Sequence, residues 1–346
     1  MPLDGVQMLR AVAALSVLVH HVFEESYALF PPGTFPTQLV LVGASGVDLF
    51  FAISGFIMLH TTWRQIGQPD AGRTFLRRRA LRVLPLYWVC LTLFFLAKGA
   101  GLYRSYTPTP YDVVASVALL PSGHLALSVA WTLVFEMYFY VLFAAWMRAP
   151  RRGLLVLGVP LTGLLLASLA AQLPPSEVRH FLTYPVALEF VFGLLLAYRY
   201  RHAGAPRGGA WIALAGLALL ACSVLFTAGI ERAEAMHALR FRFLYWGLPM
   251  ALVLYGALGL TRARSRAGRL LCALGDASYA IYLTHSFVMT AYARLLKSPQ
   301  LAALVPVHAW IVLITTFSVV LGCITHRLVE RPLSRVLHAR VERTAR

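Results

Sequence analysis

Residues 8–21 read MLRAVAALSVLVHH, an apolar run with an arginine near its start and two histidines at its end. The residues from Ala11 to Val19 are all apolar except Ser16. The apolar segment extends over 6–25, and at about 1.5 Å per residue a helix of that length crosses the roughly 30 Å core of a bilayer. This stretch therefore predicts a membrane-spanning helix that carries ionisable groups.

The rest of the chain repeats this character. Of its 346 residues, 59% are hydrophobic and 13% charged, whereas an average soluble domain is about 25% charged. Because a backbone in lipid must satisfy its own hydrogen bonds, we expect an all-α transmembrane bundle of about ten spans. Residues 111–120 are too short to span and predict a re-entrant or interfacial segment. The spans are 6–25, 43–62, 83–100, 126–147, 153–172, 181–198, 210–227, 241–260, 270–296 and 308–328.

The charged residues predict the orientation of these spans. The chain has 31 Lys+Arg against 14 Asp+Glu, and the arginines fall in short runs between apolar segments. With a cytoplasmic N-terminus, the inside loops and tail hold 22 of these cations and the outside loops 8. The positive-inside rule then places both termini in the cytoplasm. We expect one integral-membrane domain over 1–346 with a basic cytoplasmic tail at about 329–346, multi-pass in the inner membrane of a bacterium.

The four cysteines (Cys90, Cys222, Cys272 and Cys323) are scattered one to a segment. They form no C-x-x-C pair and no cysteine–histidine spacing of the kind that binds zinc. The sequence therefore predicts neither a disulfide framework nor a bound metal, and the arrangement of the arginines does not indicate nucleic-acid binding.

Arg10 and His21 share a helix face. Eleven residues separate them, which at about 100° per residue is three turns plus about 20°, and at about 1.5 Å per residue is about 16 Å along the axis. His20 lies about 100° away and is expected to point elsewhere. The alternative interpretation is a snorkelling arginine and an unrelated interfacial histidine.

Ionisable side chains at the centre of a membrane helix cost roughly 2.5–3.5 kcal/mol each for Arg, Lys or Asp and indicate function by default. Glu136 must be paired, protonated or in contact with water, and His285 is either a packing histidine or part of a site. Ser54 and Gly55 predict close helix packing rather than a nucleophile, because no G-x-S-x-G turn surrounds them. The ionisable set is Arg10, His20, His21, Asp48, Glu136, Glu189, Asp276 and His285.

A second cluster lies in FLRRRALRVLPLYW, residues 75–88. Arg78 and Arg82 are four residues apart and so share one helix face. The cluster is either an ordinary cytoplasmic anchor or a phosphate site, since arginine forks bind phosphates bidentately.

Five stretches together resemble, in order and spacing, the signature blocks of the membrane-bound acyltransferase-3 family. They are LRAVAALSVLVHHV, GVDLFFAISGF, FLRRRALRVLPLYW, WTLVFEMYFY and SYAIYLTH, and the resemblance runs from residue 4 to about 332. It implies an integral-membrane enzyme that acylates sugars, in the form without an SGNH-hydrolase domain. The implied acceptors are exopolysaccharides, O-antigens, nodulation factors, peptidoglycan or some antibiotics.

The resemblance also implies residue roles. The family's arginine, followed after ten residues by an essential histidine, falls on Arg10 and His21. Its tryptophan–glutamate block falls on Trp131 and Glu136, although Thr132 replaces the usual serine and Met137 a common second acid. The arginine block associated with cytoplasmic acyl-CoA falls on Arg78, Arg79 and Arg82. Apart from these implied roles, the residues that we expect to support the site are His285, Trp131, Ser54, Asp48 and Tyr87.

We therefore expect an O-acetyltransferase that moves an acyl group from cytoplasmic acetyl-CoA to a glycan hydroxyl, with no tightly bound cofactor. The arginine cluster would hold the phosphates of coenzyme A, and Arg10 would contact the donor nearer its thioester. His21 would act as general base or accept the acyl group transiently, and Glu136 or His285 would fix its tautomer or relay the proton. A relay through an acyl-Ser54 is the less favoured route.

A proton-coupled transporter or flippase is the competing hypothesis, because buried Arg, Glu and His also mark transport pathways. The sequence shows no inverted repeat and no paired Gly/Pro-broken helices of the kind found in such transporters. A structural scaffold would leave the five polar blocks unexplained.

Overall fold

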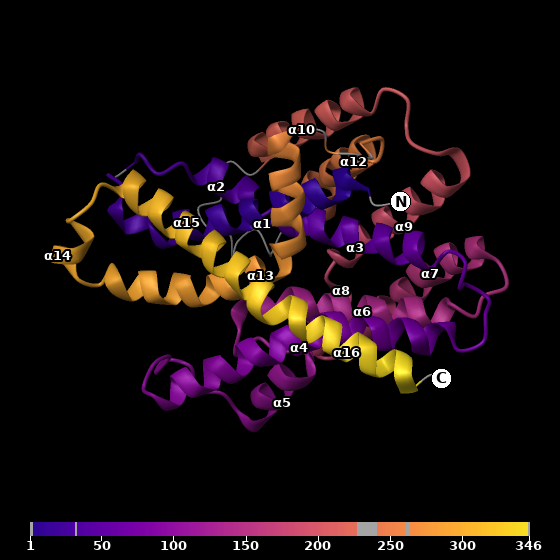
Figure 1. The fold of residues 1–346 in the computed structure, drawn as a ribbon, viewed down its shortest axis with the longest axis horizontal. Coiled ribbons are helices and arrows are strands. Elements are labelled where there is room, and N and C mark those ends of the chain that lie inside the picture. Colours follow the sequence, from indigo (N-terminus) through magenta and orange to yellow (C-terminus); the bar gives the residue numbers. More distant parts are fainter. Residues whose placement is uncertain (1–2, 32, 227–240, 261–262, 264, 345–346) are drawn as a thin grey trace. The chain divides into compact units, whose positions relative to one another are not determined.

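The computed structural model describes residues 3–31, 33–226, 241–260, 263 and 265–344, and every regular element in those ranges is helical (Figure 1). The all-α class is therefore confirmed. The chain divides into two compact units, each built from two stretches of sequence. The histidine unit comprises Met1–Ile57 and Leu188–His326, and the arginine unit comprises Met58–Ala187 and Arg327–Arg346.

The helices of the histidine unit are α1 (Asp4–Glu25), η1 (Tyr27–Leu29), α2 (Thr37–Gly43), α3 (Gly46–Thr62, whose last residues belong to the arginine unit), α9 (Ala187–Ala203), α10 (Gly209–Phe226), the π-helical η3 (Phe243–Gly247), α12 (Leu248–Ala257), α13 (Arg266–Leu295), α14 (Pro299–Ala302) and α15 (Val307–Thr325). Those of the arginine unit are α4 (Ala71–Gly99), α5 (Pro110–Ala118), η2 (Ser128–Ala130), α6 (Trp131–Trp146), α7 (Arg152–Ala170), α8 (Glu177–Thr183), the π-helical η4 (His326–Glu330) and α16 (Arg331–Thr344). The prediction of one domain over 1–346 stays a prediction, and residues 345–346 of the predicted tail lie outside the described residues.

Within the described residues, seven segments are long and apolar enough to cross a membrane. Two shorter apolar helices, Gly209–Leu225 and Phe243–Ala257, and the 30-residue α13 cover the other predicted spans. The segments are Asp4–Glu25, Val40–Thr62, Ala71–Gly99, Ser128–Trp146, Arg152–Ala170, Glu177–Ala203 and Val307–Leu337. The polytopic helical bundle is thus confirmed, whereas the cytoplasmic placement of both termini stays a prediction. Some residues that were counted in the predicted spans or in the charge balance lie outside the described residues. They are residue 227, Arg232, Arg240, Arg262, Arg264 and Arg346.

Two boundaries are informative. The third span was predicted over 83–100, but α4 already begins at Ala71, so the whole arginine cluster is helical. Arginine is a good helix former, and α4 continues through Pro85 without ending. The short segment predicted over 111–120 is α5, nine residues long, which is too short to span.

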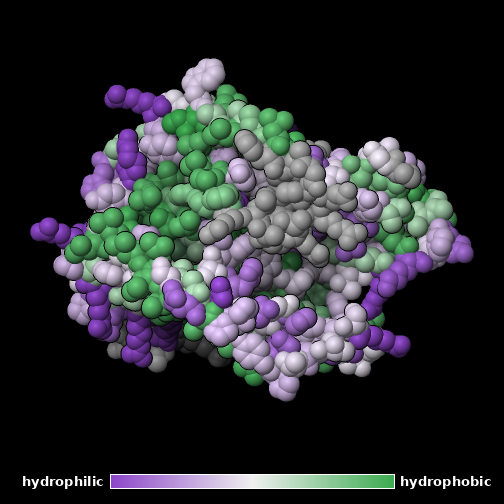
Figure 2. All heavy atoms as spheres, turned by 180° about the vertical axis from the view of Figure 1, so that it is seen from behind, coloured by the Kyte–Doolittle hydropathy of each residue, from purple (hydrophilic) through white to green (hydrophobic). Residues whose placement is uncertain are grey.

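Large apolar side chains are exposed on the helices. Leu161, Leu164 and Trp211 have 63%, 64% and 76% of their surface exposed. Figure 2 shows apolar side chains gathered over broad areas of one face, with hydrophilic ones toward the edges. Contiguous apolar surface of this extent is uncommon on soluble monomers and is what lipid contact requires.

The contact between α1 and α13 is the most extensive between helices of the histidine unit. Gly275 allows it, because a Cβ there would collide with the backbone carbonyl of Gln7. The Gln7 amide donates to the Asp276 carboxylate near one end of the contact, and the Ser26 hydroxyl lies 3.0 Å from the Tyr292 hydroxyl near the other. Between them the buried core comprises Ala14, Leu18, Val22, Ala277, Ile281, Val288 and Met289.

In the arginine unit, α4 packs against α6 and α16. Gly72 sets the first contact, since a Cβ there would meet the carbonyl of Ala144. The loop before α5 ends in a capping box between Thr109 and Asp112. The Ser122 hydroxyl and the Thr109 N–H and hydroxyl all donate to Asp112, and these bonds hold the pKa of its carboxyl below the ordinary value.

Gly275→Ala should destabilise the protein by about 1–3 kcal/mol, because overpacking at this contact outweighs the gain in helix propensity of about 1 kcal/mol. Gly99→Ala in α4 is the matched control, since nothing lies within 4 Å of a Cβ there. Thermal unfolding in detergent should show a lower midpoint for Gly275→Ala alone. An unchanged midpoint would contradict the packing described above.

Candidate active site

His21 lies in the unbroken helix α1, and its partner there is a backbone carbonyl. Its Nδ1 lies 2.9 Å from the carbonyl oxygen of Val17, one turn earlier. A carbonyl only accepts hydrogen bonds, so Nδ1 carries the proton and Nε2 carries the lone pair of the neutral ring. The ring is partly exposed. This arrangement suits a general base, because Nε2 accepts a proton while Val17 fixes the tautomer.

Two further histidines surround His21. The ring centroids of His21 and His285 are 5.1 Å apart, and those of His20 and His21 are 5.0 Å apart. His285 is 1% exposed, and neither of its nitrogens has a hydrogen-bond partner among the described residues. The sequence left open whether His285 is a packing residue, and the structure brings it to the ring of His21.

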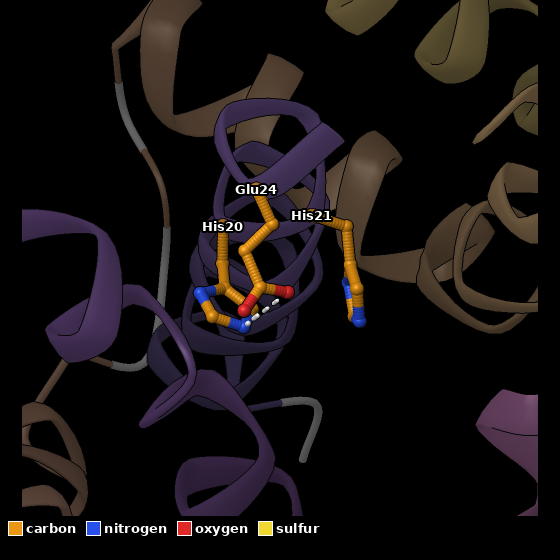
Figure 3. Close-up of side chains that lie close together, drawn as sticks. All are labelled: His20, His21 and Glu24. Atoms are coloured by element: carbon orange, nitrogen blue, oxygen red, sulfur yellow. Dashed lines mark ion pairs between the residues drawn. The ribbon is translucent and has the colours of Figure 1, made fainter. Parts of the chain in front are cut away.

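His20 was expected to point away from His21, yet the two rings meet edge to face. Its Nδ1 donates to the carbonyl of Val40 at 2.8 Å, and its Nε2 lies 3.3 Å from the Glu24 carboxylate. Figure 3 shows His20 and Glu24 facing each other, with His21 beside them on α1. The expectation failed because an angle of about 100° around the helix axis does not keep two side chains apart. Imidazole side chains on consecutive residues are long enough for their rings to meet. The i, i+4 spacing of His20 and Glu24 was a signal that could have found this pair.

Arg10 belongs to the same helix, and the unbroken α1 keeps it on the His21 face at an axial distance of about 16 Å. Its Nη1 donates to the Gln7 side chain at 3.1 Å, and the Gln7 amide in turn donates to Asp276. Arg10 is therefore linked through Gln7 to a carboxylate on α13.

The arginine unit contains a cavity of about 420 Å³, within the size range of small-molecule sites. Arg79 lies against two aromatic rings, with its guanidinium 5.4 Å from the Phe75 ring centroid and 5.6 Å from that of Tyr140. Its Nη2 also donates to the Thr61 hydroxyl at 3.4 Å. The lining residues are Thr61, Thr62, Gln65, Phe75, Arg78, Arg79, Arg82, Glu330 and Ser334. The three predicted arginines thus share one cavity, and a cavity rich in arginine forks suits an anionic ligand.

Glu136 lies on α6 of the arginine unit, and the Tyr140 hydroxyl donates to its Oε1 at 2.5 Å. Tyr140, which the sequence analysis did not single out, joins Glu136 to the Arg79 guanidinium over its ring. Trp131 begins the same helix and meets the edge of the Phe135 ring at 6.0 Å between centroids. The expected role of Glu136 or His285, to fix the tautomer of His21 or to relay its proton, stays a prediction. In the structure the Val17 carbonyl is the acceptor for His21 Nδ1.

Asp48 belongs to a buried ionic group in the histidine unit. Arg242 donates from Nε at 3.1 Å and from Nη2 at 2.7 Å to the two Asp48 oxygens, and its guanidinium lies 4.9 Å from the Trp246 ring centroid. Asp48 is 0% exposed and Arg242 2%. Glu189 is also 0% exposed, and its oxygens have no hydrogen-bond partner among the described residues. Arg242 was counted among the outside cations even though it falls inside the predicted span 241–260, and a buried aspartate predicts a buried counter-charge somewhere in the fold.

Ser54 and Tyr87 lie at contacts that hold the helices together. Next to Ser54, Gly55 packs against the backbone of Phe190, as expected for a small residue at a helix contact. The Tyr87 hydroxyl donates to the Ser116 carbonyl at 2.5 Å and so ties α4 to α5. Both residues lie outside the lining of the arginine cavity.

Comparison with known proteins adds a family assignment. A family profile described as an acyltransferase domain matches residues 3–327. The exopolysaccharide production protein ExoZ of Rhizobium meliloti is 34% identical over 314 residues, which cover 86% of this chain and 92% of that protein. The acyltransferase MdmB of Streptomyces mycarofaciens is 26% identical over 371 residues, covering 96% of this chain and 92% of that protein. The peptidoglycan O-acetyltransferase OatA of Listeria monocytogenes is 25% identical over 339 residues, covering 86% of this chain and 50% of that protein. No solved structure matches the chain significantly.

Arg242→Gln should reduce the amount of folded protein sharply, because it leaves the buried Asp48 carboxylate unpaired at a cost of about 3–5 kcal/mol. The double variant with Asp48→Asn should recover part of that loss, since two amides can hydrogen-bond in place of the ion pair. A double-mutant cycle on thermal stability should give a coupling energy above about 1 kcal/mol. Additive effects of the two substitutions would contradict the pairing.

Proposed function

Since this chain belongs to the membrane-bound acyltransferase family whose profile covers residues 3–327, we propose that it is an O-acetyltransferase acting on a cell-surface or lipid-linked glycan. The observation that carries the proposal is His21, a partly exposed histidine whose tautomer is fixed with Nε2 as the acceptor nitrogen. Two relatives have names that refer to exopolysaccharide production and peptidoglycan O-acetylation, which supports a carbohydrate acceptor.

His21 is the proposed general base. The acceptor hydroxyl gives its proton to Nε2 as its oxygen attacks the thioester carbonyl, and the imidazolium then returns the proton to the departing thiolate of coenzyme A. Val17 supports this cycle, because its carbonyl keeps accepting from Nδ1 whether the ring is neutral or charged. General base catalysis of this kind contributes typically 10²–10⁴-fold. The transfer is direct and needs no acyl-Ser54 intermediate.

The arginine unit is the proposed donor site. Arg78, Arg79 and Arg82 would hold the phosphates of acyl-CoA in the 420 Å³ cavity. The aromatic rings of Phe75 and Tyr140 hold Arg79 in place before the ligand arrives, which lowers the entropy lost on binding. In the histidine unit, Arg10 would contact the donor nearer its thioester.

The location of the enzyme follows from the charge bias. The arginine-rich loops would face the cytoplasm, where the acyl-CoA pool is, and both termini would lie on that side. The membrane would be the inner membrane of a bacterium. The glycan acceptor would reach His21 from the other side or on a lipid carrier.

His21→Ala should lower acetyl transfer from labelled acetyl-CoA in proteoliposomes by 10²-fold or more, as expected for loss of a general base. His308→Ala is the control, because His308 is an exposed histidine on α15, and its rate should be unchanged. Binding of acetyl-CoA should persist in His21→Ala. Full transfer by this variant would reject the assignment.

Arg79→Gln should raise the KM for acetyl-CoA by about 10–100-fold with little change in kcat, since a hydrogen bond to a charged group contributes about 1.5–3 kcal/mol. Arg77→Gln on the same helix is the matched control, because Arg77 is exposed and outside the cavity lining. Coenzyme A should raise the melting temperature of wild type and Arg77→Gln more than that of Arg79→Gln. Equal shifts of the melting temperature in all three proteins would show that coenzyme A does not bind in this cavity.

A further inference from the structure

The side chains around His21 form a cluster of three groups that are common metal ligands. His20, His21 and Glu24 each offer a ligand atom, and these atoms all lie within 4.8 Å of one another. Figure 3 shows the three side chains leaving neighbouring positions of α1 toward the same space. Glu24 keeps 36% of its side chain exposed, so the cluster is open to the exterior, whereas His20 is 4% exposed.

The hydrogen bonds of the two histidines to backbone carbonyls use the same ring nitrogen. Nδ1 of His20 donates to the Val40 carbonyl, and Nδ1 of His21 donates to the Val17 carbonyl. In His21 Nε2 is therefore the acceptor nitrogen, whereas Nε2 of His20 faces the Glu24 carboxylate at 3.3 Å, where a bound cation would take the place of the proton between them. Histidines that bind a metal ion characteristically donate their other N–H to a carbonyl or carboxylate, which fixes the ring and raises its basicity as a ligand.

The spacing of the rings fits a shared ion. With a Zn–N distance of about 2.0 Å, the centroids of two imidazoles on one tetrahedral zinc lie roughly 5.2 Å apart. The measured separations are 5.0 Å for His20 and His21 and 5.1 Å for His21 and His285.

His285 supplies an independent indication of a ligand. It is 1% exposed, and both its nitrogens have no hydrogen-bond partner among the described residues. Buried polar groups are nearly always paired, and a group left unpaired in a native structure calls for an explanation such as an ion. A cation bound at His21, whose ring lies beside His285, would place a partner or its bound water next to the His285 ring.

We propose that His20, His21 and Glu24 bind one divalent cation of the zinc class, with a fourth position open beside the His285 ring. Two imidazole nitrogens and one carboxylate oxygen are the ligand set of three-ligand zinc sites that keep one position open, whereas Mg²⁺ and Ca²⁺ prefer oxygen ligands. Ligand atoms on such an ion lie about 3.3 Å apart, so binding draws together atoms now separated by up to 4.8 Å. Rotation of the Glu24 side chain and of the rings supplies this movement.

Occupancy of the site has a functional consequence, which rests on the proposed role of His21. The Nε2 lone pair cannot bind a metal ion and accept the proton of a sugar hydroxyl at once. Zinc bound here therefore inhibits acyl transfer by withdrawing the base.

The binding test uses the full-length protein in detergent after removal of metals with a chelator. Titration with Zn²⁺ in a calorimeter should show one site, and Co²⁺ in its place should give the intense visible bands of a tetrahedral ion. Glu24→Gln and His20→Phe should each weaken Zn²⁺ binding by about tenfold or more, because each removes one ligand atom. His308→Ala controls for surface histidines and should bind as wild type does. Binding that is absent, or equal in all four proteins, would overturn the site.

The inhibition test compares acyl transfer with and without Zn²⁺ for each protein. Wild type and His308→Ala should be inhibited, with recovery on adding chelator, and the inhibited fraction should fall in Glu24→Gln at the same Zn²⁺ concentration. Zinc that binds at the site without slowing transfer would overturn the inhibitory role. The metal site and the proposed function fail separately, because calorimetry of zinc binding needs no acyl transfer, and His21→Ala tests the base without zinc.

Discussion

The close packing of α1 on α13 is the contact on which the arrangement of the histidine unit depends. It brings His21 and His285, from opposite ends of the sequence, to ring contact at 5.1 Å. Gly275 makes the approach possible, and polar bonds from Gln7 and Ser26 fix it along its length. Between lipid-facing helices there is little hydrophobic driving force, so close backbone packing and interhelical hydrogen bonds supply the stability. The site histidines are held by the same contact that holds the helices.

A second constraint is that most ionisable groups inside this apolar bundle are paired, although Glu189 has no hydrogen-bond partner among the described residues. Asp48 takes a bidentate bond from Arg242, Glu136 accepts from Tyr140, and Arg79 lies against aromatic rings. Some of these groups are fully paired with other residues of the fold. Others are placed so that they can bind a ligand or exchange a proton. Asp48 and Arg242 belong to the first kind. His21 and the cavity arginines belong to the second, because His21 is partly exposed and the arginines line a cavity.

The sequence predicted what depends on local pattern. Apolar length predicted the spans, helix periodicity put Arg10 and His21 on one face, and i, i+4 spacing put Arg78 and Arg82 together, which the shared cavity agrees with. What it missed is non-local. Arg242 pairs with an aspartate 194 residues away, and nothing in the residues near Arg242 distinguishes it from a loop cation. The meeting of His20 and His21 also escaped, because a helical wheel gives directions but not the reach of side chains.

The use of backbone carbonyls to orient both histidines has a physical advantage over carboxylates. Val17 and Val40 fix the Nδ1 tautomer without adding a charge, so the rings are oriented with no further desolvation cost inside the bundle. Because Val17 is one turn before His21 on the same helix, the orientation is set as soon as α1 forms. The same bond prepares Nε2 for any electrophilic partner, a proton or a metal ion alike. Acid–base chemistry and metal binding at His21 are therefore two consequences of one hydrogen bond, and they compete for one lone pair.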